Sequence, residues 1–384
     1  MAKTESSTIY LDHNGTTPVD PEVLMAMRPY LEEEFGNPSS SYPLGKRAKE
    51  GMDRAREEVA SLIGSEPREV IFTSGGSESN NMVLKGLIDL KWPERFHIIT
   101  SSVEHPALLE PAQFLTELGV RVTILPVDCF GLVDPADVRK AILPETILIS
   151  IMLANNETGT LQPIGEISKL AREYGVAVHT DAAQAVGKIE VDVRELGVDF
   201  LTVAGHKLYG PKGIGALYIR KGKDITPLIH GAAQEGGLRA GTENVILAAG
   251  LGAACRVAKK RLRDDQENME TLRNRLQDHL FDEVEGLVLN GHPERRLPNT
   301  LSVSVPGLEG VQILEGLPRI MASTGAACHE KGVKLSHVLS AMGVPPAIGM
   351  GTLRFTVGRS NTGDQIEEAA GLIVSRLKRM KDGK

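Results

Sequence analysis

The chain has 384 residues, more than one ordinary hydrophobic core accommodates, so its length predicts two domains. Hydrophobic residues make up 41% and charged residues 24% of the sequence, which is ordinary for a globular protein. The formal net charge of −7 excludes the strongly basic character typical of nucleic-acid-binding domains, so we expect no nucleic-acid partner.

Cysteine usage and apolar runs indicate the compartment. Cys129, Cys255 and Cys328 show neither metal-type spacing nor an even-numbered disulfide framework, which indicates a reducing compartment and no metal site. The first seven residues lack the apolar core of a signal peptide, and no apolar run approaches membrane-spanning length. We therefore expect a cytoplasmic protein without a membrane partner.

Strand and helix patterns alternate along the first half of the chain. A segment bounded by Gly, Thr and Pro at 10–18 and a turn at 36–40 precede a mainly polar helix expected over Tyr42–Ile63. The sequence then predicts strands at 68–73, 97–101, 122–125, 147–151 and 176–181, with helices following 74–79, 104–106, 134–135 and 163. This alternation predicts a mostly parallel sheet that is covered on both faces.

The second half begins with a short strand at 214–219 and a glycine-rich loop at 236–244. A long helix, roughly Val245–Asp282, then links the two domains, and its many charges mark a solvated face. Strands at 300–305 and 353–357 mixed with helices predict a smaller α+β domain. We expect a large α/β domain at 15–260, and a small domain formed by 1–14 with 261–384.

A carboxylate and a lysine each follow an apolar strand. Asp181 ends the strand that begins at Val176, and Lys207 follows a second apolar run 26 residues later. Ligands of open α/β sheets bind outside the carboxyl ends of the strands. Pyridoxal phosphate needs a lysine for its aldehyde and an acid that keeps its pyridine nitrogen protonated. Either residue alone is ordinarily a helix cap or a solvated charge, but the restricted turn after Lys207 favours a placed side chain.

The motif Asp181-Ala-Ala-Gln184 followed by Gly205-His-Lys207-Leu-Tyr-Gly-Pro211 resembles the cysteine desulfurases, which are class V pyridoxal-phosphate enzymes. The resemblance extends from Tyr10–Pro18 to Leu353–Arg359, nearly the whole chain. It implies the aspartate-aminotransferase-like fold of fold type I, an α/β fold with a mostly parallel central sheet and a smaller α+β domain. It also implies pyridoxal 5'-phosphate as the cofactor.

The turn Ser74–Ser79 opens a helix, where free N–H groups and the helix dipole favour an anion. Many strand–helix turns share this character, and the resemblance places the cofactor phosphate at Gly76 and Ser77. His206 and Thr242 are the further phosphate candidates. Because the resemblance assigns Thr242 to the phosphate of a neighbouring subunit, it implies a homodimer.

The remaining cofactor and substrate roles also come from the resemblance. His105 would stack on the pyridine ring and move protons, although a histidine at a helix start is ordinarily a cap. Gln184 would bond the ring hydroxyl. Asn156, otherwise part of a polar turn, and Arg354 would hold the substrate, since a guanidinium matches a carboxylate bidentately. Lys207 would hold the cofactor and act as general base.

Cys328 differs from the other two cysteines, which fit an ordinary structural role. It lies in a small, polar, glycine-bearing segment at 322–332 that predicts a mobile loop, with His329 and Lys331 nearby to favour a thiolate. It aligns with the cysteine that forms a persulfide in desulfurases. We therefore expect catalytic residues Lys207, Cys328 and His105.

The resemblance implies conversion of L-cysteine to L-alanine, with sulfur passed through Cys328 to an acceptor protein for iron–sulfur clusters or other uses. Gly-Ala-Ala-Cys-His also resembles selenocysteine lyases, so L-selenocysteine is the nearest alternative substrate. A class V aminotransferase is favoured less because it has no use for Cys328, and a non-enzymatic scaffold is favoured least. Ala204 departs from the desulfurase pattern, which often has a hydroxyl residue there that bonds the phosphate.

Overall fold

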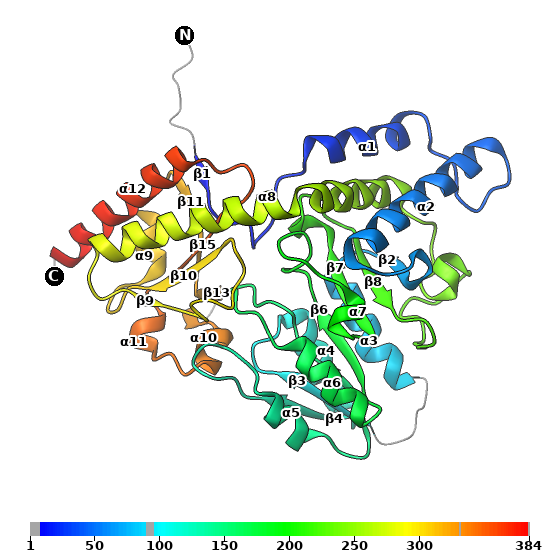
Figure 1. The fold of residues 1–384 in the computed structure, drawn as a ribbon, viewed down its shortest axis with the longest axis horizontal. Coiled ribbons are helices and arrows are strands. Elements are labelled where there is room, and N and C mark those ends of the chain that lie inside the picture. Colours follow the sequence, from blue (N-terminus) through cyan, green and yellow to red (C-terminus); the bar gives the residue numbers. More distant parts are fainter. Residues whose placement is uncertain (1–7, 90–95, 330–331, 383–384) are drawn as a thin grey trace, which may run out of the picture.

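The computed structural model describes residues 8–89, 96–329 and 332–382, with the backbone alone at 89, 326–329 and 332–333. Figure 1 shows a large and a small sheet region joined by one long helix, α8 (Val245–Glu283). The predicted long helix is therefore confirmed to within one residue of its end. Among the helices of the described ranges, none has the length and apolar character needed to cross a membrane.

The large sheet has seven strands in the order β2-β8-β7-β6-β5-β3-β4. These strands are β2 (Val70–Thr73), β3 (His97–Ser101), β4 (Arg121–Leu125), β5 (Thr146–Ser150), β6 (Ala177–Asp181), β7 (Phe200–Ala204) and β8 (Gly215–Ile219). Neighbouring strands in the series β7-β6-β5-β3-β4 pair in parallel, whereas β8 is antiparallel to both β7 and β2. The predicted mostly parallel sheet is confirmed.

Helices cover both faces of the large sheet because successive strand residues alternate between two apolar clusters. Ile98 and Leu148 pack on the side of α3 (Gly76–Asp89) and α4 (Pro106–Glu117). Their neighbours Ile99 and Ile149 pack on the side of helices α2 (Pro43–Ile63), α6 (Ile164–Glu173) and α8. A strand buried on both faces reads as a continuous apolar run, which is why these strands could be predicted.

The other helices of this part are α1 (Pro21–Glu32), α2 (Pro43–Ile63), α5 (Pro135–Ala141), α6 (Ile164–Glu173) and α7 (Val193–Leu196). The sequence analysis assigned no helix to α1, although Asp20 caps it and Pro21 opens it. The same Asp–Pro signal had marked α5 at Asp134. The start signal was therefore present, and its apolar periodicity is weak because much of α1 faces solvent.

The small sheet is antiparallel in the order β12-β15-β10-β9. It contains β9 (Val288–Leu289), β10 (Thr300–Ser304), β12 (Ser323–Thr324) and β15 (Thr352–Thr356), and its region also holds β1 (Ile9–Tyr10), β11 (Ile320–Met321), α9 (Gly310–Glu315), α10 (His337–Ala341), α11 (Pro346–Gly349) and α12 (Gly363–Asp382). β1 pairs in parallel with β11, so the beginning of the chain packs against its C-terminal part.

Helix α8 contributes to two apolar clusters. Its residues up to Ala258 pack with the large sheet, and those from Met269 onward pack with the small sheet and α12. Leu297 packs with the first cluster although it lies far beyond α8 in sequence. We retain the expected domain division near residue 260 as a proposal.

A separate hairpin carries Cys328. Strands β13 (Ala326–His329) and β14 (Gly332–Leu335) pair in antiparallel fashion, with Cys328 opposite Val333. The segment that the sequence predicted as a mobile loop therefore contains a paired hairpin, whose ladder hydrogen bonds satisfy its backbone groups. The side chain of Cys328 lies outside the described part of the structure, and the expected mobility stays a prediction.

Candidate active site

A cavity of about 390 Å³ opens at the carboxyl ends of β6 and β7. Small-molecule sites occupy roughly 300–1,000 Å³, so this volume suits a cofactor. The predicted residues that line it are Gly76, Ser77, His105, Asn156, Asp181, Gln184, His206, Lys207 and Arg354. This cavity lies where the rule that ligands bind at the carboxyl ends of parallel strands predicted a site.

Lys207 enters this cavity from the one-turn 3-10 helix η2 (Gly205–Lys207), directly after β7. Its Nζ donates to the backbone carbonyls of Asn14 at 2.5 Å and Gly15 at 2.7 Å. Burial, followed by the nearby charge of Arg354, lowers the pKa of Lys207 to about 8. An amine with this pKa is partly unprotonated near neutrality, as a nucleophile or general base requires.

The turn after Lys207 is held in an unusual conformation. Tyr209 adopts a φ of 64°, which is rare for a bulky residue. Its N–H donates to Thr17 Oγ1 at 2.8 Å, and its hydroxyl accepts from the N–H of Arg359 at 2.8 Å. The Arg359 guanidinium also lies 4.0 Å from the centre of the Tyr209 ring. These contacts from both ends of the chain fix the segment that delivers Lys207.

Asp181 forms a buried anionic wall at the end of β6. Its Oδ2 accepts from Asn80 Nδ2 at 2.7 Å, and its Oδ1 accepts from the N–H of Ala183 at 2.9 Å. Asn80 Oδ1, by contrast, is buried without a hydrogen-bond partner within the described ranges. The wall therefore offers a carboxylate and a free acceptor side by side.

The start of α3 forms another wall of the cavity. Gly75 has a φ of +149°, which permits the sharp change of direction from β2 into the helix that begins at Gly76. The N–H groups of a first helical turn lack partners within the helix and attract anions. A Cβ atom at Gly76 would lie 3.6 Å from the methyl of Ala204, so a methyl occupies the position where the desulfurase pattern often has a hydroxyl.

His206 also lines the cavity. Its Nδ1 lies 3.2 Å from Thr16 Oγ1. Burial, followed by the charge of Lys207, lowers the pKa of His206 to about 4, so its imidazole is neutral at pH 7. A neutral imidazole can still donate one hydrogen bond to an anion.

His105 is both a helix cap and part of the cavity wall. It is the N-cap of α4, and its Nδ1 accepts from the N–H of Ala107 at 3.0 Å. Because Nδ1 is an acceptor there, a neutral ring carries its proton on Nε2. The residue also lines the cavity, so the capping contact selects the tautomer that faces a ligand.

The residue before His105 is a buried acid. Glu104 accepts from Ser101 Oγ at 2.6 Å and from the N–H of Met152 at 2.9 Å, which ties the ends of β3 and β5 together. Burial raises the pKa of Glu104 to about 8. The sequence analysis missed this residue, because an acid beside a helix start resembles an ordinary surface group.

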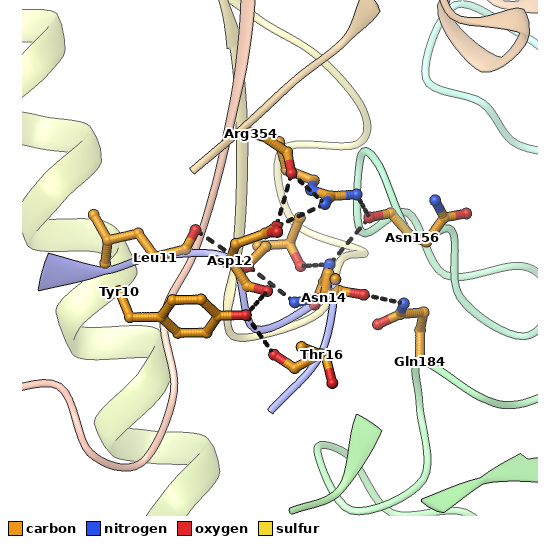
Figure 2. Close-up of polar contacts among 12 residues, drawn as sticks. Tyr10, Leu11, Asp12, Asn14, Thr16, Asn156, Gln184 and Arg354 are labelled. Carbon is orange, nitrogen blue, oxygen red and sulfur yellow. Dashed lines mark hydrogen bonds and ion pairs between the residues drawn. The ribbon is translucent and has the colours of Figure 1, made fainter. Parts of the chain in front are cut away.

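Arg354 lies at the cavity edge on β15, where the small sheet region meets the large one. Its Nη2 pairs with Asp12 Oδ1 at 2.7 Å and donates to Ser323 Oγ at 3.0 Å, while Nη1 donates to the carbonyl of Asn156 at 3.0 Å (Figure 2). The backbone of Asn156, rather than its amide, makes this contact. A guanidinium held in this way can pair with an incoming carboxylate, either in place of Asp12 or together with it.

Asn14 is a second residue that the sequence analysis missed. Its backbone carbonyl accepts from Lys207 and from Gln184 Nε2, the latter at 3.0 Å. Its side-chain Nδ2 donates to Thr300 Oγ1 at 2.9 Å and to the carbonyl of Asn156 at 3.1 Å (Figure 2). Asn14 therefore connects the N-terminal segment, the large sheet and the small sheet at the floor of the site.

Among the predicted phosphate residues, Thr242 does not line this cavity. It is exposed and borders a separate hollow of about 270 Å³. The preceding loop is anchored by Glu235, which accepts from both terminal nitrogens of Arg56 at 2.7 and 2.8 Å. Its expected contact with a neighbouring subunit stays a prediction.

The residues of the cavity fit pyridoxal phosphate. An amine with a lowered pKa, a buried hydrogen-bonded carboxylate and the start of a helix line one cavity. These are the groups that can bond the aldehyde, the ring nitrogen and the phosphate of that cofactor.

Comparisons with known proteins agree with this geometry. Residues 9–368 match the aminotransferase class-V family. Over 375 residues the chain is 46% identical to cysteine desulfurase IscS of Dictyoglomus turgidum, covering 97% of this chain and 95% of that protein. A solved NifS-like protein has a TM-score of 0.91 at 38% identity, with 97% of this chain and 99% of that chain covered. A structure described as SspA in complex with cysteine has a TM-score of 0.83 at 36% identity, covering 92% of this chain and 100% of that one.

Proposed function

We propose, from the premise that the chain belongs to the aminotransferase class-V family and within it to the cysteine desulfurases, that it converts L-cysteine to L-alanine and passes the sulfur to Cys328. The observation that carries the proposal is the amine of Lys207, with a pKa of about 8, in one cavity with the buried carboxylate of Asp181. The cysteine named with SspA supports the same substrate class.

Bound pyridoxal phosphate supplies an aldehyde carbon and an electron-accepting ring. Lys207 would hold the aldehyde end, and the carboxylate of Asp181 would keep a proton on the ring nitrogen. Ser77 and the start of α3, with His206, would bind the phosphate. Gln184 would donate its amide N–H to the ring hydroxyl, and His105 would cover the ring.

The substrate would be oriented by the cavity edge. Arg354 would bind the carboxylate of cysteine, with the neighbouring Asn156 segment closing that side. The amine of Lys207, once free, would take the α-proton as general base and return a proton during formation of alanine. The pKa of about 8 places both protonation states of Lys207 within reach near neutral pH.

The sulfur step would take place on Cys328. Its thiolate would attack the substrate sulfur, forming the S–S bond as the carbon–sulfur bond breaks. The electron pair of the broken bond stays with the substrate carbon, which is protonated to give alanine. The enzyme is left as a persulfide, so one cysteine and one thiol give one alanine and one persulfide without an added oxidant. A second thiol, on an acceptor protein, would then take the outer sulfur.

A homodimer would complete the site through Thr242. The support is that Thr242 is exposed and lies outside the cavity of its own chain. The segment formed by α1 and the residues after it exposes several large apolar side chains that a partner could cover, namely Leu24, Met25, Leu31, Phe35 and Tyr42.

Cys129 and Cys255 are free thiols, which supports placement in a reducing, cytoplasmic compartment.

The proposal is tested by incubating the purified protein, loaded with pyridoxal phosphate, separately with cysteine and with selenocysteine. We expect alanine from cysteine, together with a persulfide on the peptide that contains Cys328 by mass spectrometry. Release of selenium without turnover of cysteine would replace the proposal by a selenocysteine lyase. Keto-acid formation without alanine would replace it by an aminotransferase.

A further inference from the structure

Lys188 is a buried lysine without a carboxylate partner. It lies in the turn after β6 and is only 4% exposed. Its Nζ donates to Gln184 Oε1 at 2.7 Å and to Asn14 Oδ1 at 3.0 Å. Within the described ranges it forms no ion pair, so two amide oxygens are its recorded partners. Burial of an amine in such surroundings costs folding free energy, so a role other than stability is expected for Lys188.

The charged groups that face Lys188 are cations, and they add to the free energy cost of its burial. Lys207 and Arg354, after burial itself, hold the pKa of Lys188 well below its usual range. The charge of Lys188 in turn contributes to the lowered pKa values of His13 and His206. The turn therefore places an amine beneath a site that already contains two cationic side chains.

The contacts of Lys188 determine which way two amides point. Asn14 Oδ1 accepts from Lys188 and also from Asn299 Nδ2 at 3.0 Å, so its Nδ2 faces Thr300. Gln184 Oε1 faces Lys188, and Gln184 Nε2 must donate to the carbonyl of Asn14 because a carbonyl cannot donate. One hydrogen of Gln184 Nε2 is then left over, on a residue that lines the cavity.

We infer that Lys188 is a positioning residue that holds the amides of Asn14 and Gln184, so that an N–H of Gln184 faces the cavity and the Asn14 carbonyl stays against Lys207. The inference rests on the proposed function for the identity of the ligand, whose anionic ring oxygen would meet this N–H. Removal of the amine leaves Gln184 Oε1 without this donor and leaves Asn14 Oδ1 with the bond from Asn299, so Gln184 is the side chain that is released.

The first test is the affinity of the apoprotein for pyridoxal phosphate, measured by equilibrium dialysis in the absence of amino acid. Lys188→Met should weaken binding by roughly tenfold, as loss of a donor to buried acceptors predicts. The matched control is Arg273→Met, since Arg273 is also 4% exposed but does not line the cavity. The control should keep the affinity of the parent. Equal affinity for the parent and Lys188→Met would overturn the inference.

The second test asks whether Lys188 acts through Gln184. In a double-mutant cycle, Lys188→Met should weaken binding much less in a Gln184→Ala background than in the parent. The pH at which the bound cofactor changes its absorbance should shift in Lys188→Met and should not shift further in the double variant. Additive losses in affinity would show a general structural effect and overturn the inference.

Two features of these experiments distinguish a variant that fails to fold from a failure of the proposed reaction. If Lys188→Met does not fold, the cycle is run with Lys188→Gln, which retains an amide donor and should lose less affinity. If the parent binds pyridoxal phosphate and the cycle shows coupling, but cysteine yields no alanine, the proposed reaction fails while the positioning role of Lys188 stands.

Discussion

The floor of the cavity and the Cys328 hairpin differ in how firmly the chain holds them. Asn14, Gln184 and Lys207 are joined by hydrogen bonds that connect residues 170 to 193 positions apart. The strands β13 and β14 pair with one another in a two-stranded sheet of their own. The cavity floor is therefore fixed from several directions, whereas the hairpin that carries Cys328 pairs within itself, and its mobility and its role in sulfur transfer stay predictions.

The sharpest test of the fixed region is Lys207→Ala. Without the amine, both cofactor attachment and proton transfer from the α-carbon are lost, and general-base catalysis alone is worth about 10²–10⁴-fold. We expect alanine formation to fall by at least that factor, measured with saturating cofactor and cysteine. Pyridoxal phosphate should still bind through the start of α3. Turnover within tenfold of the parent would contradict the assignment.

The corresponding test of the hairpin is Cys328→Ala. We expect no labelled persulfide and strongly reduced alanine formation from cysteine, because no thiolate takes the sulfur. Selenocysteine turnover should be spared relative to cysteine, since a more acidic leaving group departs more readily. Cofactor affinity should match that of the parent, which separates the hairpin from the cavity floor. Alanine formation at the parental rate would show that Cys328 is not the sulfur acceptor.

A smaller loss is expected for Asp181→Ala. Removal of one partner from a buried hydrogen-bonded charge pair costs about 2–5 kcal/mol, so turnover should fall roughly a hundredfold. Covalent attachment to Lys207 should persist, because the amine and its carbonyl contacts are unchanged. The measurement is steady-state turnover together with borohydride trapping of the attached cofactor. An unchanged rate with full cofactor loading would exclude Asp181 as the partner of the ring nitrogen.

The mildest change concerns the strand ends beside His105. Burial raises the pKa of Glu104 from 4.5 to about 8, so between these pH values the folded apoprotein binds more protons than the unfolded chain. The stability contributed by protonated Glu104 is therefore full below pH 4.5 and is lost as the pH rises toward 8. Glu104→Gln should remove a change of about 5 kcal/mol across this window, measured by urea unfolding. An identical pH dependence in both proteins would contradict it.

The sequence predicted the parts of the site that follow from local order. Asp181 and Lys207 each follow a continuous apolar strand, and parallel strands bring their carboxyl ends to one edge. The turn at Gly76 was likewise recognisable from its glycines and the helix that follows. These inferences needed few neighbours, and the structure places all three residues on one cavity.

Other features depended on contacts that no local pattern records. Asn14 finds Asn156 and Thr300 at separations of 142 and 286 residues, and the N-terminal segment that carries it also buries Lys188. A lysine in a turn is ordinarily solvated, so its burial could not be anticipated. The Cys328 hairpin was expected to be a loop because small residues allow many backbone conformations, and pairing with β14 decides among them.

The N-terminal segment has a consequence for synthesis on the ribosome. The N–H of Asn14 donates to Thr356 Oγ1, which is incorporated 342 residues later. At translation rates of about 5–20 residues per second, Asn14 therefore waits roughly 20 to 70 seconds for this partner. Since the Asn14 carbonyl is what Lys207 contacts, a nascent chain can form much of its large sheet before it can complete the cofactor site. Completion of the cofactor site in its final geometry therefore depends on the emergence of β15, which carries Thr356.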